Sequence, residues 1–321
     1  MIMYRIQFMT RANIISTFSR VLAYFQSGWR RQAIPFLFFL LSVAVILSVL
    51  ANNWQTLITY HWQVRPHWLL YAFIFMSFDL LLGAYAWHLL MTRLGPYNNR
   101  RHNFKFWLYA NLARRLPGPV WHIASRAVLY EEKGISKTVT SMTSGLELAI
   151  ILVSGAVTFF LVLPFWVIPD SVRSQLNQSW LLLIILLPCL LLVHPRSLNT
   201  IWQKLGHQSP NQRLYWHETM KWLLLYIPIW IIGGIVLYCV SNMFQPVPRM
   251  QFFPLIGMWV ITNILSLAGT LTFTGMGLRE ISLTLLLALF MPPPVALLTV
   301  IVLRLTWLGG ELGGALISLL L

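Results

Sequence analysis

Long apolar runs separated by short polar stretches dominate the chain. An α-helix needs about 20 consecutive apolar residues to cross the hydrocarbon core of a bilayer, so each run of roughly that length predicts a transmembrane helix. The pattern therefore predicts an all-α polytopic membrane protein with about six full transmembrane helices. They cover residues 34–50, 68–91, 139–163, 180–193, 220–240 and 295–321.

Two further apolar segments contain helix breakers. Residues 104–130 include Leu116-Pro117-Gly118-Pro119, and residues 254–291 include a Gly/Thr-rich stretch from Gly269 to Gly277. Each fits either two short helices that dip into the membrane and return, or full spans, giving up to about eight in all. In each segment an Asn is followed by apolar residues, then by the break and then by an Arg, so the two segments could form an internal repeat. The alternatives are a basic cytoplasmic loop for the first and a loop joining two complete helices for the second.

Charged residues are few and mostly basic, with 23 Lys and Arg against 8 Asp and Glu and a net charge of +15. Most of the basic residues fall in residues 1–33, 92–137 and 195–221. The loops that alternate with these segments, residues 52–67, 164–179 and 242–253, carry one basic residue each. The positive-inside rule then places both termini in the cytoplasm, in a multi-pass protein of the cell (inner or plasma) membrane. The apolar runs leave little solvated surface for a nucleic acid, so we expect no such partner.

The first 33 residues form a basic arm, distinct from the single transmembrane domain predicted for residues 34–321. Ile14, Phe18, Phe25 and Trp29 recur at helical spacing among arginines. This pattern predicts an amphipathic helix on an anionic lipid surface, the cytoplasmic leaflet. The alternative is a flexible basic tail that acts only as a topology signal.

Common catalytic and nucleotide-binding motifs, such as GxxxxGK[ST], HExxH and GxSxG, are absent from the sequence. Its 8 histidines are scattered without metal-ligand spacing, and its 2 cysteines both lie in apolar runs. We therefore expect neither an enzyme nor a bound cofactor or metal.

Arginines beside the two breaks are the candidate binding groups. A full transmembrane helix could not carry Arg114, Arg115 and Arg126 to lipid without a large cost, whereas two short helices could line a polar cavity. The ends of broken helices can hold an anionic group there, and Arg can clamp a phosphate through two hydrogen bonds. The candidate substrate-binding residues are Asn111, Arg114, Arg115, Pro117, Gly118, Arg126, Gly275, Gly277 and Arg279.

Four acidic residues and one further arginine lie inside apolar sequence. Glu147 and Glu280 sit near the breaks and are candidates for ion pairing or proton coupling. Arg304 and Glu311 are seven residues apart, so they share one helix face. For Asp79, structural hydrogen bonding is as good an explanation as function.

The order of these features resembles the family of the lysylphosphatidylglycerol synthase transmembrane region, also called the flippase-like domain family. The resembling residues are Asn111-Leu112, Pro117-Gly118, Arg126, Gly134, Glu147, Gly275-Met-Gly277-Leu-Arg279-Glu280, Pro292–Pro294 and Arg304. The resemblance implies a flippase-like transporter. At the first break the family often has Pro-Gly-Arg-x-Gly-Glu, whereas this chain has Pro117-Gly118-Pro119-Val120-Trp121-His122. Since no aminoacyl-transferase domain follows residue 321, the resemblance implies the stand-alone form, without lipid aminoacylation.

The leading hypothesis is a translocase that moves an anionic lipid or lipid-linked saccharide between leaflets. Its headgroup would be held by arginines in a polar cavity between the two broken segments, while Glu147 and Glu280 pair with these arginines when the cavity is empty or carry a proton. One alternative is a non-transporting scaffold or accessory subunit of an envelope lipid or glycan synthesis complex, with a glycosyltransferase as partner. A second is a membrane-embedded lipid transferase with Glu147 or Glu280 as general base.

Overall fold

The computed structural model describes residues 51, 54–59, 64–113, 121–166, 190–191, 193–204, 214–271 and 275–318. Every regular element within these ranges is helical, which confirms the all-α class. The predicted arm 1–33, the span 34–50 and nearly all of the span 180–193 lie outside the described residues. So do four of the candidate site residues, Arg114, Arg115, Pro117 and Gly118.

The helices follow one another in a simple order along the chain. They are α3 (Trp54–Thr59), α4 (His67–Leu94), α5 (Arg100–Ala113), α6 (Trp121–Glu131), α7 (Lys137–Val162), η1 (Leu163–Phe165), α10 (Pro195–Lys204), α11 (Trp216–Phe244), η3 (Arg249–Gln251), α12 (Phe252–Leu271), α13 (Gly275–Leu287) and α14 (Pro293–Ser318).

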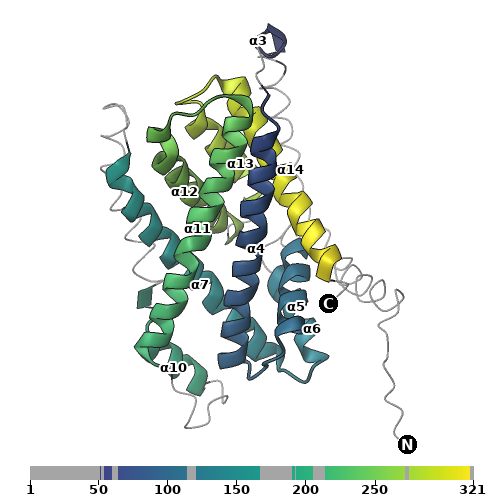
Figure 1. Cartoon of the computed structure of the whole chain (residues 1–321). Helices are drawn as coiled ribbons and strands as arrows, with labels where there is room; N and C mark the ends of the chain where they lie inside the picture. The colour runs from purple at the N-terminus through teal and green to yellow at the C-terminus, as the bar shows by residue number, and fades with distance from the viewer. Residues whose placement is uncertain are drawn as a thin grey trace, which may run out of the picture.

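Five stretches in the described residues are long and apolar enough to cross a membrane. Four of them contain α4, α7, α11 and α14 and confirm the spans predicted for residues 68–91, 139–163, 220–240 and 295–321. The fifth, Arg249–Leu267, includes most of α12 and belongs to the second broken segment. The long helices run along the bundle, with α11 packed against α4, α7 and α12 (Figure 1).

Polar contacts at one end of the bundle fix the antiparallel pairing of α4 and α11. The Arg93 guanidinium in the last turn of α4 donates to both carboxylate oxygens of Glu218, with Nε–Oε1 2.5 Å and Nη2–Oε2 3.2 Å. Glu218 lies in the first turn of α11 and also accepts from the backbone N–H of Tyr215, which completes a capping box. The end of α4 and the start of α11 are therefore held side by side.

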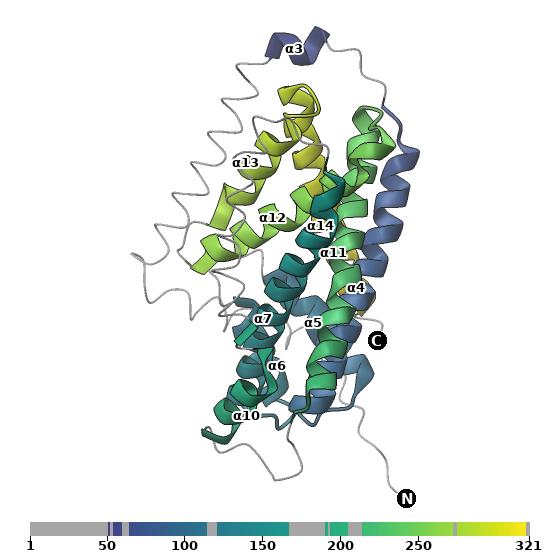
Figure 2. The ribbon, with the colours of Figure 1, turned by 90° about the vertical axis from the view of Figure 1, so that its left-hand side faces the viewer.

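The first broken segment forms a helical hairpin at this same end. Helices of 14 and 11 residues are about 21 and 17 Å long, shorter than the roughly 30 Å hydrocarbon core. They pack on each other, α5 also on α4 and α6 also on α7. Both lie at the end of the bundle where α4 finishes (Figures 1 and 2). Each of the two helices is therefore too short to form a complete span by itself.

The second broken segment forms a hairpin at the opposite end. Helix α12 packs along α13, which has 13 residues, and α13 packs on α14. In Figures 1 and 2, α13 runs back toward the end of the bundle where α14 begins. The two hairpins therefore enter the bundle from opposite ends.

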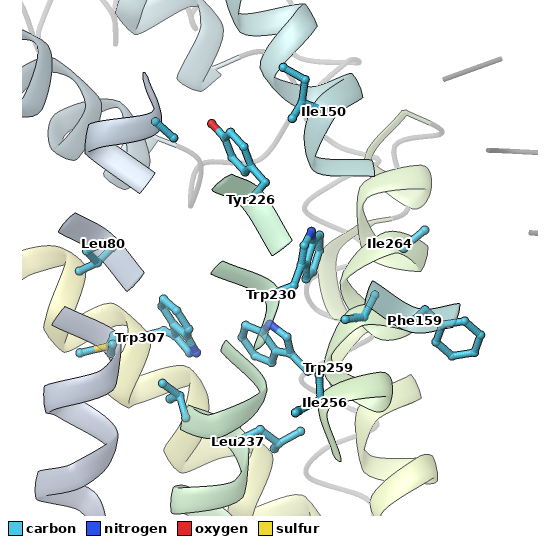
Figure 3. Packing of buried hydrophobic residues seen from close by; sticks show 14 of the residues in the cluster. Leu80, Ile150, Phe159, Tyr226, Trp230, Leu237, Ile256, Trp259, Ile264 and Trp307 are labelled. Atoms are coloured by element: carbon cyan, nitrogen blue, oxygen red, sulfur yellow. The ribbon is translucent and has the colours of Figure 1, made fainter. Parts of the chain in front are cut away.

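The contact between α11 and α12 depends on glycines, because aromatic and aliphatic side chains of α12 lie directly on the α11 backbone (Figure 3). A Cβ atom at Gly234 would lie 2.7 Å from Ile256 Cα, so backbone must move to admit it. We expect Gly234→Ala to lower the free energy of unfolding by about 1–3 kcal/mol, measured by denaturant titration in detergent micelles. Gly145→Ala is the matched control, since nothing lies within 4 Å of its Cβ position. Equal effects of the two substitutions would contradict the predicted close contact.

Candidate functional site

Arg126 and Glu147 form an ion pair in the interior of the bundle. Arg126 on α6 donates through Nη1 to Glu147 Oε2 on α7, and their side chains are 0% and 1% exposed. Glu147 Oε1 accepts two more hydrogen bonds, from Trp107 Nε1 at 3.1 Å and from Tyr226 OH at 3.0 Å. The carboxylate therefore joins four helices, α5, α6, α7 and α11.

Aromatic and amide side chains surround the Arg126 guanidinium. It lies over the Trp87 ring of α4, with Cζ 4.0 Å from the ring centroid. Trp87 Nε1 donates to Tyr130 OH at 2.9 Å, and Tyr130 OH donates to Asn103 Oδ1. The Asn103 amide nitrogen lies 2.9 Å from His88 Nδ1. Because an amide nitrogen can only donate, His88 Nδ1 is the acceptor, which fixes the tautomer of that histidine. These bonds tie the first hairpin to α4.

The charge of Arg126 is compensated, but its guanidinium group is not fully hydrogen-bonded. Arg126 Nε and Nη2 are buried without a hydrogen-bond partner among the described residues. Its charge is balanced by the Glu147 carboxylate and by the negative face of the Trp87 ring. Because removal of either partner would leave a buried charge uncompensated, we infer that this pair holds the first hairpin firmly in place.

A second cluster of charged residues lies between the second hairpin and α14. Arg304 Nη1 on α14 donates to Glu280 Oε1 on α13 at 2.8 Å. The Arg279 guanidinium lies over the Trp259 ring of α12 with Cζ 4.4 Å from the centroid. Trp259 in turn stacks on Trp307 of α14, with centroids 5.4 Å apart and planes 16° apart.

A small pocket opens at this second cluster. Its wall is formed by Arg279, Glu280, Leu283, Val300, Leu303, Arg304 and Trp307. Arg304 lies eleven residues after the start of α14 and fourteen before its end, near the middle of the span. Its side chain is 43% exposed, whereas that of Glu280 is 16% exposed. An arginine at this depth is costly in a membrane and marks a functional site by default.

Asp79 and Glu311 lie together where α4 packs on α14. Both are mostly buried, at 8% and 9% exposure, and their carboxyl groups interact electrostatically. The helices come close here, since a Cβ at Gly310 would lie 2.0 Å from Met76 Cε. The sequence pattern places Arg304 and Glu311 on one face of α14. In the structure Arg304 is exposed and pairs with Glu280 of α13, whereas Glu311 lies next to Asp79 of α4.

The structure distributes the candidate residues over these sites. Arg126 with Glu147 and Arg279 with Glu280 and Arg304 form two clusters, and the pocket wall contains no residue of the first. Asn111 is buried in α5, with no hydrogen-bond partner for Oδ1 among the described residues. Gly275 and Gly277 lie in the first turn of α13.

Sequence reasoning missed the aromatic and amide partners of both clusters. In a chain that is 14% aromatic, no spacing distinguishes a tryptophan that contacts a charge from one that faces lipid. The missed residues are Trp87, Asn103, Trp107, Tyr130, Tyr226, Trp259 and Trp307.

Comparison with known proteins adds the family. The profile of the family described as "Lysylphosphatidylglycerol synthase TM region" matches residues 33–309, which include all helices of both clusters except the last turns of α14. No individual curated protein matches the chain. The family match confirms the resemblance carried by the two breaks and their arginines. The chain therefore belongs to the family of the lysylphosphatidylglycerol synthase transmembrane region.

Proposed function

We propose that this protein is a translocase that moves an anionic lipid or lipid-linked saccharide between the leaflets of the cell membrane, without changing its covalent bonds. The observation that carries the proposal is the pocket beside α13. Arg279 and Arg304 both line this pocket, and Arg304, near the middle of the membrane-spanning helix α14, pairs with Glu280 of α13. Arginine at this depth attracts an anion.

The positions of the two hairpins support the same function. Broken helices that enter from opposite sides and meet charged residues near mid-membrane are typical of transporters with alternating access. Each hairpin has an arginine stacked on a tryptophan, Arg126 on Trp87 and Arg279 on Trp259. The first cluster is closed to solvent, whereas Arg304 of the second is partly exposed. In the proposed cycle this conformation closes the first cluster to solvent and leaves the second cluster accessible to it.

Competition for one arginine provides a way to bind and release the headgroup. In the empty pocket Glu280 holds Arg304. An entering phosphate displaces the carboxylate, and the returning carboxylate displaces the phosphate, because both make charge-assisted hydrogen bonds of similar strength. The first cluster would act in the other conformation, after Glu147 releases Arg126.

Loss of Arg304 is expected to abolish most of the movement of lipid between the leaflets. Removal of a charge-assisted hydrogen bond is worth about 1.5–3 kcal/mol, so Arg304→Ala should slow translocation tenfold or more. The measurement is the dithionite accessibility of fluorescent phosphatidylglycerol and of a polyprenyl phosphate sugar in proteoliposomes. Arg249→Ala removes an exposed arginine of η3 and should leave the rate unchanged.

Two results would contradict the proposal. One is wild-type protein that moves neither lipid faster than protein-free vesicles do. The other is Arg304→Ala protein that moves them at the wild-type rate. Absence of movement together with co-purification of a glycosyltransferase would favour the scaffold alternative.

A further inference from the structure

A histidine of α4 accepts a hydrogen bond from the first hairpin that only its neutral form can accept. We propose that the contact between His88 and Asn103 is a pH-sensitive switch: protonation of His88 releases α5 from α4 and favours the conformation in which the first cluster opens. The effect on lipid movement rests on the proposed function, whereas the release of α5 does not. The inference follows from the hydrogen bonds of Asn103, from a second partner for the protonated ring and from the charges around it.

The Asn103 side chain is fully buried and its amide has a fixed orientation. Its Nδ2 lies 3.0 Å from the Tyr97 carbonyl oxygen, which can only accept, and its Oδ1 accepts from Tyr130 OH. The other hydrogen of Nδ2 is therefore donated to His88 Nδ1, 2.9 Å away. Through these bonds Asn103 joins the start of α5 to α4, to α6 and to the loop before α5.

Only a neutral His88 fits this arrangement. A protonated imidazole carries a hydrogen on both ring nitrogens, so its Nδ1–H would face the N–H of Asn103. A flip of the Asn103 amide would not remove the conflict. Oδ1 would then face the Tyr97 carbonyl oxygen, and the Tyr130 hydroxyl would lose its acceptor. Protonation of His88 therefore breaks its bond to α5.

Thr92 offers the protonated ring another partner. Its hydroxyl oxygen lies 3.4 Å from His88 Nδ1, and it belongs to the same helix, one turn further on. Because a hydroxyl can accept as well as donate, the Nδ1–H of a protonated ring can turn to Thr92 Oγ1. Protonation thus exchanges a partner on α5 for a partner on α4. The ring has an acceptor or a donor in both states, but it joins the two helices in only one.

The charges around His88 add to this effect. The titratable groups on the elements around this part of α4 are Tyr85 and Arg93 on α4, Tyr97 before α5, Arg100 and His102 on α5, Arg126 and Tyr130 on α6, Glu147 on α7, Glu218 on α11 and Glu311 on α14. The glutamates of α7 and α11 are bonded to arginines. Arg100 acts on His88 electrostatically, and its Cζ lies 5.8 Å from the centroid of the Tyr85 ring. A protonated His88 is therefore repelled by Arg100 of α5.

The same contacts connect the switch to the first cluster. Tyr130, which donates to Asn103, accepts from Trp87, and the Trp87 ring carries the Arg126 guanidinium. Trp107 follows Asn103 by four residues on α5 and donates to the Glu147 carboxylate. Release of α5 therefore loosens the surroundings of both members of the buried ion pair. In the proposed cycle, this is the step that lets Glu147 release Arg126.

The test is hydrogen–deuterium exchange of the purified full-length protein in detergent micelles. It compares pH values of about 5.5 and about 7.5, between which histidine changes its charge. Labelling times are scaled for the intrinsic change of exchange rate with pH. We expect the backbone amides of α5 to lose about tenfold in protection at the lower pH, because a hydrogen bond between helices is lost. The amides of α12, which packs on α7, α11 and α13, should keep theirs.

Three variants make the test specific to His88. His88→Asn keeps an acceptor near the position of Nδ1 but does not titrate, so α5 should stay protected at both pH values. Asn103→Asp gives the protonated ring a carboxylate acceptor, so acid should protect α5 rather than expose it. His102→Asn is the matched control on α5. It removes the neighbouring histidine, whose Nδ1 lies 2.6 Å from Tyr97 OH, and should keep the wild-type response.

Equal protection of α5 at both pH values in wild-type protein would overturn the switch. A wild-type response to acid in His88→Asn or Asn103→Asp protein, or a lost response in His102→Asn protein, would also overturn it. Thermal melting at the higher pH identifies variants that do not fold, and the wild-type comparison decides even if one of them fails.

Movement of lipid is measured separately, so the switch and the translocase can fail separately. Albumin extraction of a short-chain fluorescent phosphatidylglycerol from proteoliposomes follows it at the same two pH values. Acid should speed movement about threefold to tenfold in wild-type protein and leave His88→Asn protein unchanged. Release of α5 without faster movement would overturn the link to transport. Release of α5 without any movement at either pH would overturn the translocase and leave the switch standing.

Discussion

Glu147→Ala is expected to lower the free energy of unfolding by about 3–5 kcal/mol, one of the two largest effects in this protein. The substitution leaves the Arg126 guanidinium fully buried without its counter-charge. It also removes the acceptor of the Trp107 and Tyr226 hydrogen bonds. Denaturant titration in detergent micelles measures the change.

Two comparisons separate the ion pair from other effects. Arg126→Leu combined with Glu147→Ala removes both charges and should recover most of the loss, because a buried pair is often neutral relative to apolar residues. Glu131→Ala breaks an exposed pair with Lys137, whose side chain is 56% exposed, and should change stability by less than about 1 kcal/mol. A double variant as unstable as Glu147→Ala would show that the buried charge is not the cause.

The hydrophobic pattern predicted the spans well because hydrocarbon imposes a strong local requirement. The prediction for residues 68–91 corresponds to α4, His67–Leu94, and that for residues 139–163 to α7 with η1. Boundaries shifted by a few residues because caps and turns, rather than hydropathy, end the helices. For example, Ser136 starts α7 by accepting a hydrogen bond from the backbone N–H of Thr138.

The ion pairs show where sequence stops being informative. Sequence reasoning identified every charged residue of the two clusters, since charges in apolar runs are conspicuous. It did not choose the partners, because Arg126 and Glu147 are 21 residues apart and Arg304 and Glu280 are 24 apart, on different helices. Helix packing decides such pairs, and a single sequence does not encode the crossing positions locally.

The break itself was a stronger signal than its arginines. A Pro-Gly pair breaks a helix, so the sequence favoured two short helices at residues 104–130, with full spans or a basic cytoplasmic loop as alternatives. The depth of the hairpin depends on contacts that have no sequence signature, such as Trp107 against Gly83, where a Cβ would lie 2.6 Å from the indole ring. Such close contacts place the hairpin, and with it Arg126.

Trp230→Ala is expected to lower the free energy of unfolding by about 3–5 kcal/mol, because it empties the contact between α11 and α7. The Trp230 ring is 8% exposed and lies on the α7 backbone, 2.9 Å from the Cβ position of Gly155. Its Nε1–H donates to Ile151 O and to Ser154 Oγ, both at 3.1 Å. Denaturant titration in micelles again measures the loss.

Trp230→Phe separates ring volume from the hydrogen bond. Phenylalanine fills most of the space and lacks the N–H, while the Ser154 hydroxyl still donates to Ile151 O, so the loss should be only about 1 kcal/mol. Trp216→Ala, on the same helix but 53% exposed, should change stability by less than about 0.5 kcal/mol. If Trp230→Ala and Trp230→Phe were equally unstable, the N–H rather than the ring would join the two helices. Since α7 carries Glu147 and α11 carries Tyr226, a loosened contact here should also weaken the hydrogen bond that holds the first cluster.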